Sequence, residues 1–346
     1  MDSLVKNFHF SLAMDSKWDC LLWFLLFVGL FKSLGFLWRT GLVIAQTFLI
    51  PGKSLSLFGV KSAWAVVTGA SDGIGREFAL QLGAAGFNVV LMARNESALK
   101  ELATEIEQKS GVSTKIHLID FTKTNEDSYA AITEQLSSLD IGVLVNNVGC
   151  GHSISADFVD VSQQEFGDIV AVNVTANVRV TRVILPMMIK RSAKSVKNRG
   201  LIINVGSFSG AVPIPMLQTY SATKAFLATF STALAEEVRQ HRITVEHLNA
   251  YFIVTKLSKI SRTSLFVPTA KPYVAAVLSK IGLACGAAYT GRPNTSSPFW
   301  GHAVLDWYIN SFPGGPSSFI ETSFRMQRGL RASRLRKLER EKNAQH

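Results

Sequence analysis

Two kinds of hydrophobic pattern divide the chain. Near the N-terminus, apolar residues run without a break from Cys20 to Phe31 and resume, after Lys32, from Leu34 to Trp38. This span of 19 residues with one lysine is close to the roughly 20 residues with which a helix crosses a bilayer. A second apolar run, Gly41 to Ile50, is too short to cross alone. The pattern predicts an uncleaved N-terminal membrane anchor.

A cleaved signal peptide is the competing interpretation of this segment. The length of the apolar stretch, and the absence of a clear small-x-small site directly after it, favour the anchor. Bases are denser on the C-terminal flank of the span, at Lys32, Arg39, Lys53 and Lys61, than on the N-terminal flank. The positive-inside tendency therefore predicts that the main domain faces the cytosol.

From residue 64 onward, short runs typical of buried strands alternate with helical patterns. Such alternation implies right-handed crossovers and a parallel sheet that is covered on both faces. We therefore predict an α/β domain with a doubly wound, Rossmann-like parallel sheet. The expected strands are Trp64–Val67, Phe87–Ala93, Thr114–Ile119, Ile141–Val145, Leu201–Val205 and Thr244–Leu248, and the expected helices are Arg76–Gly83, Glu96–Lys109, Ser128–Ser137, Phe166–Arg191 and one from Tyr220 to about Gln240.

Composition narrows the class of partner. The three cysteines have neither a metal-ligand spacing nor the pattern of a disulfide framework, so we expect packing residues, a reducing compartment and no metal site.

The formal charge of +11 comes from five bases between Lys190 and Arg199 and from the segment Arg325 to Lys342, which carries a net +6. Aromatic residues are not interleaved with these bases. The charge therefore predicts an anionic surface or substrate, and no nucleic acid.

Three glycines mark a candidate nucleotide site. Gly69, Gly73 and Gly75 follow the first predicted strand and open the first predicted helix. Glycines at such a turn let the backbone approach a pyrophosphate, which the helix N-terminus then stabilises. A tight turn without a ligand is the alternative. The surrounding strand-turn-helix pattern favours dinucleotide binding.

The end of the second predicted strand indicates which dinucleotide is bound. An NAD site usually has an acid there, which binds the ribose 2′-hydroxyl. This chain has Ala93-Arg94-Asn95 instead, with Arg76 just after the glycines. An arginine pairs with a 2′-phosphate, so we predict NADPH as the cofactor. Glu96 is an acid nearby, which we assign to the first turn of a helix.

Tyr220 and Lys224 are four residues apart, which places them on one face of a helix. An ammonium group beside a phenol favours its ionisation, whereas an isolated tyrosine titrates near 10. The pair alone arises by chance in many helices. Whether this pair is catalytic therefore depends on whether companion motifs occur elsewhere in the chain.

Those companions are present in register. Thr68-Gly69-x-x-x-Gly73-x-Gly75, Asn146-Asn147-Val148-Gly149, Asn173, Ser207 and Tyr220-x-x-x-Lys224 resemble, in order and spacing, the short-chain dehydrogenases/reductases over about residues 62 to 258. Within that family, the anchor and the segments 251–256 and 264–268 resemble the very-long-chain 3-oxoacyl-CoA reductases of microsomal fatty-acid elongation, which are related to the 17β-hydroxysteroid dehydrogenase type 12 proteins.

The resemblance implies roles for individual residues. Tyr220 would donate a proton to the substrate oxygen, and Lys224 would lower the pKa of the tyrosine and bind the nicotinamide ribose. Ser207 would polarise the carbonyl, with Ser209 as its rival, and Asn173 would hold a water in the proton relay. Asp120 would contact the adenine. The cofactor-binding set implied is Gly69, Ser71, Gly73, Ile74, Gly75, Arg94, Asp120, Asn147, Val148, Tyr220, Lys224, Val254 and Thr255.

Two features depart from the family pattern. Ala250-Tyr251 stands where the family commonly has Pro-Gly, so we expect a different backbone near the nicotinamide. Residues 190 to 198 also lengthen a loop that is usually shorter, which we interpret as a solvated surface loop.

The expected organisation is an anchor and linker over residues 1–60, a catalytic domain over 61–258, an apolar segment over 259–316 and a basic tail over 317–346. The apolar segment covers an acyl chain, lies against the bilayer or packs in the core, and the sequence leaves these three open. The tail suits an anionic membrane face, a CoA phosphate contact or a solvated helix.

The resemblance implies NADPH-dependent reduction of a long-chain 3-oxoacyl-CoA in the endoplasmic reticulum membrane, with other elongation enzymes and a second copy of the chain as partners. Two alternatives remain: reduction of a steroid or retinoid ketone, and a scaffold of the elongation complex that binds NADP(H) without turnover.

Overall fold

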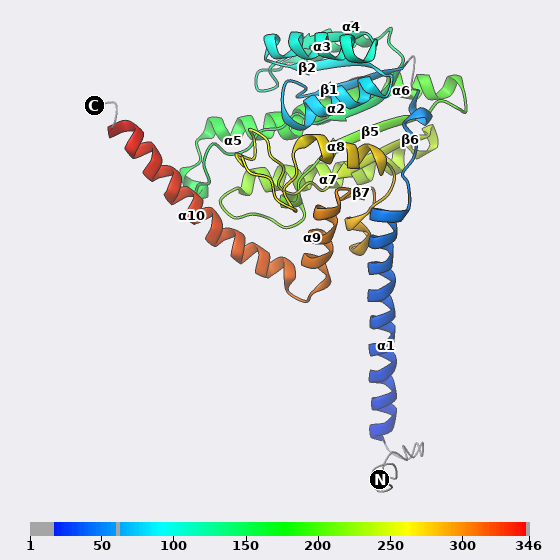
Figure 1. Ribbon diagram of the computed structural model, residues 1–346, viewed down its shortest axis with the longest axis vertical. Helices are drawn as coiled ribbons and strands as arrows, with labels where there is room; N and C mark the ends of the chain where they lie inside the picture. The colour runs from blue at the N-terminus through cyan, green and yellow to red at the C-terminus, as the bar shows by residue number, and fades with distance from the viewer. Residues whose placement is uncertain (1–16, 60–62, 344–346) are drawn as a thin grey trace. The chain divides into compact units, whose positions relative to one another are not determined.

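The computed structural model describes residues 17–59 and 63–343 (Figure 1). Features expected at residues 1–16, 60–62 and 344–346, including part of the anchor's N-terminal flank, Lys61 and the last residues of the basic tail, lie outside the described residues. The chain forms two compact units, one ending at Gly41 and one beginning at Leu42.

The first unit contains most of a single long helix, α1 (Lys17–Ile44). The two apolar runs seen in the sequence are therefore one continuous helix, which passes Gly41 and ends in a π-helical turn, η1 (Ala45–Leu49). Within residues 18–49 an 18-residue window reaches a mean hydropathy of 2.1, and the large apolar side chains are exposed. By length and composition this helix is able to span a bilayer.

A second helical stretch of the described chain, residues 163–194, also contains an 18-residue window apolar enough for a span, with a mean hydropathy of 1.3. Its apolar side chains contribute to the core of the second unit. It is a core helix by its packing.

The second unit is built on a seven-stranded parallel sheet in the order β3-β2-β1-β4-β5-β6-β7. The predicted doubly wound sheet is confirmed. The last strand, a two-residue edge strand paired to β6, was not predicted. The strands are β1 (Trp64–Thr68), β2 (Asn88–Ala93), β3 (Thr114–Leu118), β4 (Ile141–Asn146), β5 (Gly200–Val205), β6 (Ile243–Leu248) and β7 (Thr295–Ser296).

Helices cover both faces of this sheet (Figure 1). The central strands are buried on both sides, which explains their unbroken apolar sequences. One apolar core lies between the sheet and α2 (Gly73–Ala84), α3 (Glu96–Ser110) and α8 (Ala270–Ser279). The other lies between the sheet and α4 (Glu126–Leu136), η4 (Ala171–Ala176), α6 (Asn177–Lys194) and α7 (Gln218–Val238). The helix α5 (Gln163–Val170) directly precedes η4.

The long predicted helix from Phe166 is interrupted by the π-helical turn η4, and α6 then continues to Lys194, so the expected surface loop is short. Arg191 does not belong to a solvated basic patch. It is buried, its Nε lies 3.0 Å from Asp140 Oδ1, and its Nη1 donates to the carbonyl of Arg199 at 2.7 Å. This arginine ties the end of α6 to the start of β5.

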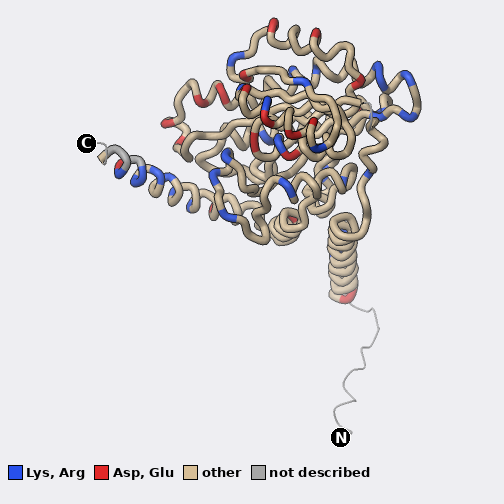
Figure 2. The backbone as a smooth tube through the Cα atoms, turned by 45° about the horizontal axis from the view of Figure 1, so that its top comes forward, with Lys and Arg blue, Asp and Glu red and all other residues tan. Residues whose placement is uncertain are grey.

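The chain ends in α9 (Trp300–Ser311) and α10 (Gly315–Asn343). Lysines and arginines follow α10 along its length (Figure 2). Near the start of α10, Phe319 packs edge-on against the Phe208 ring. Near the middle of α10, Arg331 donates to Asp157 at 2.8 Å and to Asp160 at 2.7 Å. The first half of α10 is therefore packed on the catalytic unit.

Candidate active site

The carboxyl ends of the central strands carry the predicted site residues, because in a parallel sheet these ends meet at one edge. Lys224, on α7, is buried, and its Nζ lies 5.6 Å from the centre of the Tyr220 ring. The Ser207 hydroxyl, just beyond β5, hydrogen-bonds the Tyr220 phenol. The structure thus brings together the serine, tyrosine and lysine.

Ser209, the rival of Ser207, lies behind it. Its hydroxyl donates to Ser207 Oγ at 2.9 Å, and its backbone N–H donates to the same oxygen at 3.2 Å. Ser209 is buried, so Ser207 is the serine that faces the tyrosine. Two donors on Ser207 Oγ leave its own proton directed elsewhere, which suits a hydroxyl that donates to a substrate oxygen.

The predicted lowering of the Tyr220 pKa by Lys224 stays a prediction, because burial dominates the pKa of Tyr220 in this structure. Burial raises the pKa of Tyr220, and the hydrogen bond from Ser207 only partly opposes it. The Lys224 ammonium instead donates to the carbonyl of Val205 at 2.9 Å. A phenol with a raised pKa is protonated at neutral pH, which is the form that a proton donor needs.

Burial also acts on Lys224, whose pKa it lowers to about 8. The amine is therefore charged at neutral pH and becomes neutral as the pH rises through 8. If the ammonium serves the reaction, we expect the rate of ketone reduction to fall above about pH 8, by up to about tenfold per pH unit. A kcat profile followed by NADPH oxidation measures this. Lys224→Arg removes the titrating group, and a wild-type profile that stays flat well above pH 8 contradicts the assignment.

Asn173 lies in the π-helical turn η4, a feature frequent at functional sites. Its Oδ1 accepts from the Cys150 N–H at 2.8 Å, and its Nδ2 donates to the Cys150 carbonyl at 2.9 Å and to Thr223 Oγ1 at 3.0 Å. Both amide hydrogens are used by protein groups. The side chain thus positions the segment after β4 beside Lys224, and the water-holding role stays a prediction.

The glycine-rich loop has the shape that a pyrophosphate requires. Gly69 and Gly73 have φ of 65° and 55°, a region that favours glycine. A Cβ at Gly75 would lie 2.2 Å from the Gly69 carbonyl oxygen and 2.4 Å from Asn147 Nδ2. Asp72, which precedes α2, makes no side-chain cap, so the first N–H groups of this helix are open to an anion. These residues fit a dinucleotide.

The neighbouring strand ends complete this cleft. Asn147 Nδ2 donates to the carbonyls of Thr68 and Gly69 at 3.0 and 3.1 Å, and the N–H of Val148 donates to Thr68 Oγ1 at 3.0 Å. On the opposite side, the Thr255 methyl group lies 3.2 Å from where a Gly73 Cβ would stand. The nicotinamide and phosphate regions predicted from the sequence are therefore adjacent.

The adenine end is marked by Asp120 and Arg94. Burial opposes ionisation of Asp120, but two hydrogen bonds from Thr122 and the charge of Arg94 hold the pKa of this carboxyl below its usual value. Arg94 is exposed at the end of β2. Arg76, the second candidate for a 2′-phosphate contact, is paired with Glu105 of α3.

Tyr251, which departs from the family pattern in the sequence, packs beside the candidate active site. Its ring stacks on Phe208, the neighbour of Ser207, with centroids 4.2 Å apart, and the Phe208 N–H donates to the Ala250 carbonyl at 2.8 Å. His302 and Phe319 contact this pair from α9 and α10. Sequence reasoning flagged Tyr251 but missed Phe208 as its partner.

We expect Tyr251→Ala to lower kcat by about tenfold and stability by roughly 3 kcal/mol, because it removes the ring that holds Phe208 beside the serine. Tyr251→Phe keeps the ring and serves as the matched control, with values near wild type. Steady-state kinetics and thermal unfolding measure the two effects. Equal losses in both variants would show that the hydroxyl, rather than the stack, matters.

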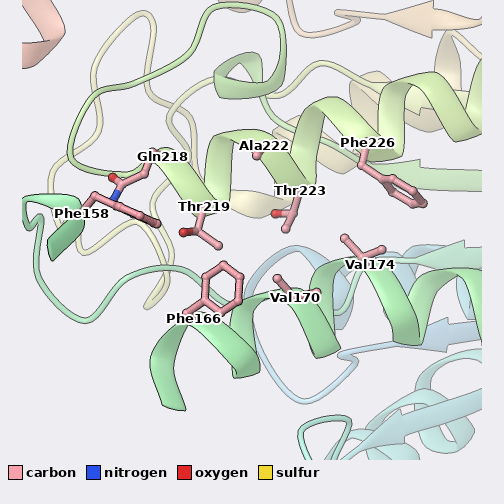
Figure 3. A pocket seen from close by; sticks show the side chains of 9 residues that line it. All are labelled: Phe158, Phe166, Val170, Val174, Gln218, Thr219, Ala222, Thr223 and Phe226. Atoms are coloured by element: carbon pink, nitrogen blue, oxygen red, sulfur yellow. The ribbon is translucent and has the colours of Figure 1, made fainter. Parts of the chain in front are cut away.

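An apolar groove lies on the outer side of α7, against α5 and η4 (Figure 3). It has a volume of about 420 Å³, and its walls include Phe158, Phe166 and Phe226. Tyr220, Lys224 and Ser207 are not among its lining residues. It is separate from the candidate active site.

Among residues 17–59 and 63–343, no group of three His, Cys, Asp or Glu side chains gathers to hold a metal ion. Of the cysteines, which were expected to be packing residues, Cys285 is buried, Cys150 is half-buried and Cys20 is exposed on α1. Burial raises the pKa of the Cys150 thiol to about 11.

The fold and the cleft define a nucleotide-dependent oxidoreductase, and comparison with known proteins identifies the family. Residues 63–265 match the model of the short chain dehydrogenase family. The chain belongs to this family.

Curated relatives are similar over the whole chain. The very-long-chain 3-oxoacyl-CoA reductase of Coprinopsis cinerea is 55% identical over 346 residues, which is 100% of both chains. The protein of the same name from Laccaria bicolor is 53% identical over 99% of this chain and 98% of its own.

Solved structures agree with the fold. A short-chain dehydrogenase from Sphingobium yanoikuyae in complex with NADPH has a TM-score of 0.57 and 27% identity, covering 68% of this chain and 87% of its own. The 3-ketoacyl-(acyl-carrier-protein) reductase from Brucella melitensis, complexed with NADH, has a TM-score of 0.56 and 27% identity over 68% and 96%.

Proposed function

We propose that the protein reduces very-long-chain 3-oxoacyl-CoA to 3-hydroxyacyl-CoA with NADPH, as the ketone-reducing step of microsomal fatty-acid elongation. The observation that carries this proposal is the convergence of Ser207, Tyr220 and Lys224 at the strand ends, in a chain similar along its full length to reductases of that name.

The roles follow from the chemistry of each side chain. When bound, NADPH supplies the hydride for the substrate carbon. Ser207 donates a hydrogen bond to the ketone oxygen, and Tyr220, held protonated by burial, gives that oxygen its proton. Lys224 orients the ribose and keeps a positive charge near the phenol as the proton leaves.

The preference for NADPH over NADH rests on Arg94. No acid stands at the end of β2 to bind a ribose 2′-hydroxyl, and the exposed Arg94 is placed to pair with a 2′-phosphate. The other residues proposed to line the cofactor are Gly69, Ser71, Gly73, Ile74, Gly75, Asp120, Asn147, Val148, Val254 and Thr255.

We expect Arg94→Ala to raise the KM for NADPH by about 10- to 100-fold and to leave the KM for NADH nearly unchanged, because one charge-assisted contact to phosphate is lost. Arg76→Ala is the matched control, since Arg76 is already paired with Glu105. Kinetics with both cofactors measure the ratio. A larger effect of Arg76→Ala would assign the phosphate to that arginine instead.

We propose the endoplasmic reticulum membrane as the location, with α1 as the anchor and the catalytic unit in the cytosol. The apolar surface of α1 and the bases that follow it support this orientation. Asn95-Glu96-Ser97 and Asn294-Thr295-Ser296 match the glycan acceptor pattern. A mobility shift on glycosidase treatment would place the unit in the lumen and overturn the orientation.

Partnership with other elongation enzymes, and a homodimer, remain predictions from the resemblance. The substrate itself is tested with the purified full chain, NADPH and 3-oxoacyl-CoAs of increasing acyl length, beside a steroid ketone. We expect turnover of the long acyl-CoAs and little of the steroid. Turnover of the steroid alone would replace the proposal, and NADPH binding without any turnover would favour a scaffold.

A further inference from the structure

An exposed aromatic face runs along α9 and the loop beside it. Trp300, Val304 and Tyr308 recur every four residues of α9, so they lie on one side of the helix. Phe312 follows the last residue of α9, and its ring centre lies 5.3 Å from that of Tyr308. Leu265 and Phe266 extend this side, with the Phe266 and Trp300 ring centres 6.4 Å apart. We call these six residues the aromatic face. Each has at least a third of its surface exposed, and Leu265 has 69%.

The opposite side of α9 is buried and holds the polar groups. Asp306 accepts hydrogen bonds from Asn249 at 3.0 Å, Ser297 at 2.6 Å and Asn310 at 2.8 Å. Near it, His302 Nε2 lies 3.2 Å from the Phe252 carbonyl. The helix is thus anchored to the sheet by its polar residues and turns its aromatic ones outward, the reverse of the usual order in water.

The charges that this segment itself exposes are of one sign. Between residues 252 and 312 the sequence has one acid, Asp306, which is fully buried. The same segment has six bases, of which four are exposed: Lys256, Lys259, Arg262 and Lys271. Lys256 is paired with Asp72 at 3.3 Å. A segment with exposed aromatic rings and bases, and without an exposed acid of its own, is complementary to the headgroup region of an anionic bilayer.

The apolar groove of Figure 3 provides the contrast. Phe158, Phe166 and Phe226 are also exposed there, but the adjoining elements carry Asp157, Asp160, Glu165 and Asp168. An acidic border repels anionic lipid. The segment that carries the aromatic face exposes bases instead.

The chain also enters the catalytic unit next to α9. The turn η1 belongs to this unit and lies against α9. It is fixed there because the Cys285 N–H donates to Gln46 Oε1 at 2.9 Å and Lys280 Nζ donates to the Ile50 carbonyl at 2.7 Å. Directly before η1 stands the apolar helix proposed as the membrane span. The residues that join span and catalytic unit therefore contact the helix that carries the aromatic face.

We propose that the aromatic face rests in the headgroup region of an anionic bilayer, as a second membrane contact besides the anchor. Tryptophan and tyrosine rings favour this region because one part of each ring is apolar and another is polar. Of the apolar segment 259–316, α8 and the inner side of α9 thus pack in the core, and the contact assigns the outer side of α9 and the loop beside it to the lipid surface.

The contact has a consequence for substrate entry, which rests on the proposed function. Phe252 and Leu257 are exposed between the aromatic face and the candidate active site, and Leu257 and the Tyr220 ring both approach Gly151. A very long acyl chain held in the bilayer would then reach the catalytic tyrosine along an apolar rim, without crossing water.

Site-specific fluorescence in the full chain tests the contact. In a background with Cys20→Ser, Cys150→Ala and Cys285→Ala, Val304→Cys is labelled with an environment-sensitive dye, and Phe226→Cys is the matched control on the groove of Figure 3. The protein is reconstituted in phosphatidylcholine vesicles with phosphatidylserine and lipids that carry a quencher. We expect at least about twofold quenching at position 304 and none at 226. Equal fluorescence at both positions would overturn the proposal.

A second measurement leaves the cysteines in place. Tyr308→Glu is expected to raise the KM for a very-long-chain 3-oxoacyl-CoA in vesicles several-fold, with the KM for a short, water-soluble one and the Tm unchanged. Phe226→Glu should change neither KM. If the wild-type chain reduces no acyl-CoA, the proposed function fails, but the quenching result still decides the membrane contact. Equal KM values for Tyr308→Glu and wild type on the long substrate count against it.

Discussion

Replacing Tyr220 with phenylalanine is expected to lower kcat for ketone reduction by about 10³-fold and to leave NADPH binding and the Tm close to wild type. General acid catalysis contributes typically about 10²- to 10⁴-fold, and the substitution removes only the proton-bearing oxygen. The ring of Tyr220 keeps its contacts, because the lost group hydrogen-bonds the Ser207 hydroxyl rather than the packed core.

Single-turnover oxidation of NADPH separates this loss from a change in binding, which fluorescence of the bound nicotinamide measures independently. Ser209→Ala is a useful control, since Ser209 contacts Ser207 from behind and not the tyrosine. We expect a smaller loss for it. Wild-type turnover by Tyr220→Phe would remove the tyrosine from the reaction.

The second large effect concerns the glycine-rich loop. Gly75→Ala places a Cβ 2.2 Å from the Gly69 carbonyl oxygen and 2.4 Å from Asn147 Nδ2, so the backbone that cradles the pyrophosphate has to move. We expect NADPH affinity to fall by at least about tenfold, and the Tm to fall as well, because overpacking typically costs about 1–3 kcal/mol.

Gly167→Ala is the matched control. It also lies within a helix, α5, and a Cβ there meets nothing within 4 Å, so affinity and Tm should stay at wild-type values. Titration with NADPH and thermal unfolding with and without the cofactor measure both quantities. Unchanged NADPH affinity in Gly75→Ala would place the dinucleotide elsewhere.

Much of the fold was predictable because the sheet is parallel and buried. Strands such as β1 and β4 are covered on both faces and therefore appear as unbroken apolar runs bounded by glycine or asparagine. Strand β7 has no such signal. Its two residues, Thr295 and Ser296, pair with β6 only because the chain passes that edge.

The site was predictable where function restricts the sequence locally. The spacing of Tyr220 and Lys224 places both on one helix face. Glycine is required at position 75 because the Gly69 backbone lies too close for a Cβ there. The direction of the Tyr220 pKa shift was not predictable, because it depends on burial, which residue spacing does not reveal.

Contacts between distant segments were likewise hidden. The stack of Tyr251 on Phe208, and the approach of Phe319 from α10, exist only once three separate elements are folded together. Arg191 shows the same limit for charge. It belongs to a basic run in the sequence and is buried against Asp140 in the fold.

The most direct test follows the hydrogen itself. The purified full chain is supplied with NADPH that carries deuterium at the transferable position, together with a very-long-chain 3-oxoacyl-CoA, and the product is analysed by mass spectrometry. The proposed function predicts a 3-hydroxyacyl-CoA with one deuterium at C3 from the wild-type protein and almost none from Tyr220→Phe. Wild-type protein that binds NADPH but forms no deuterated product, or equal product from both proteins, would contradict it.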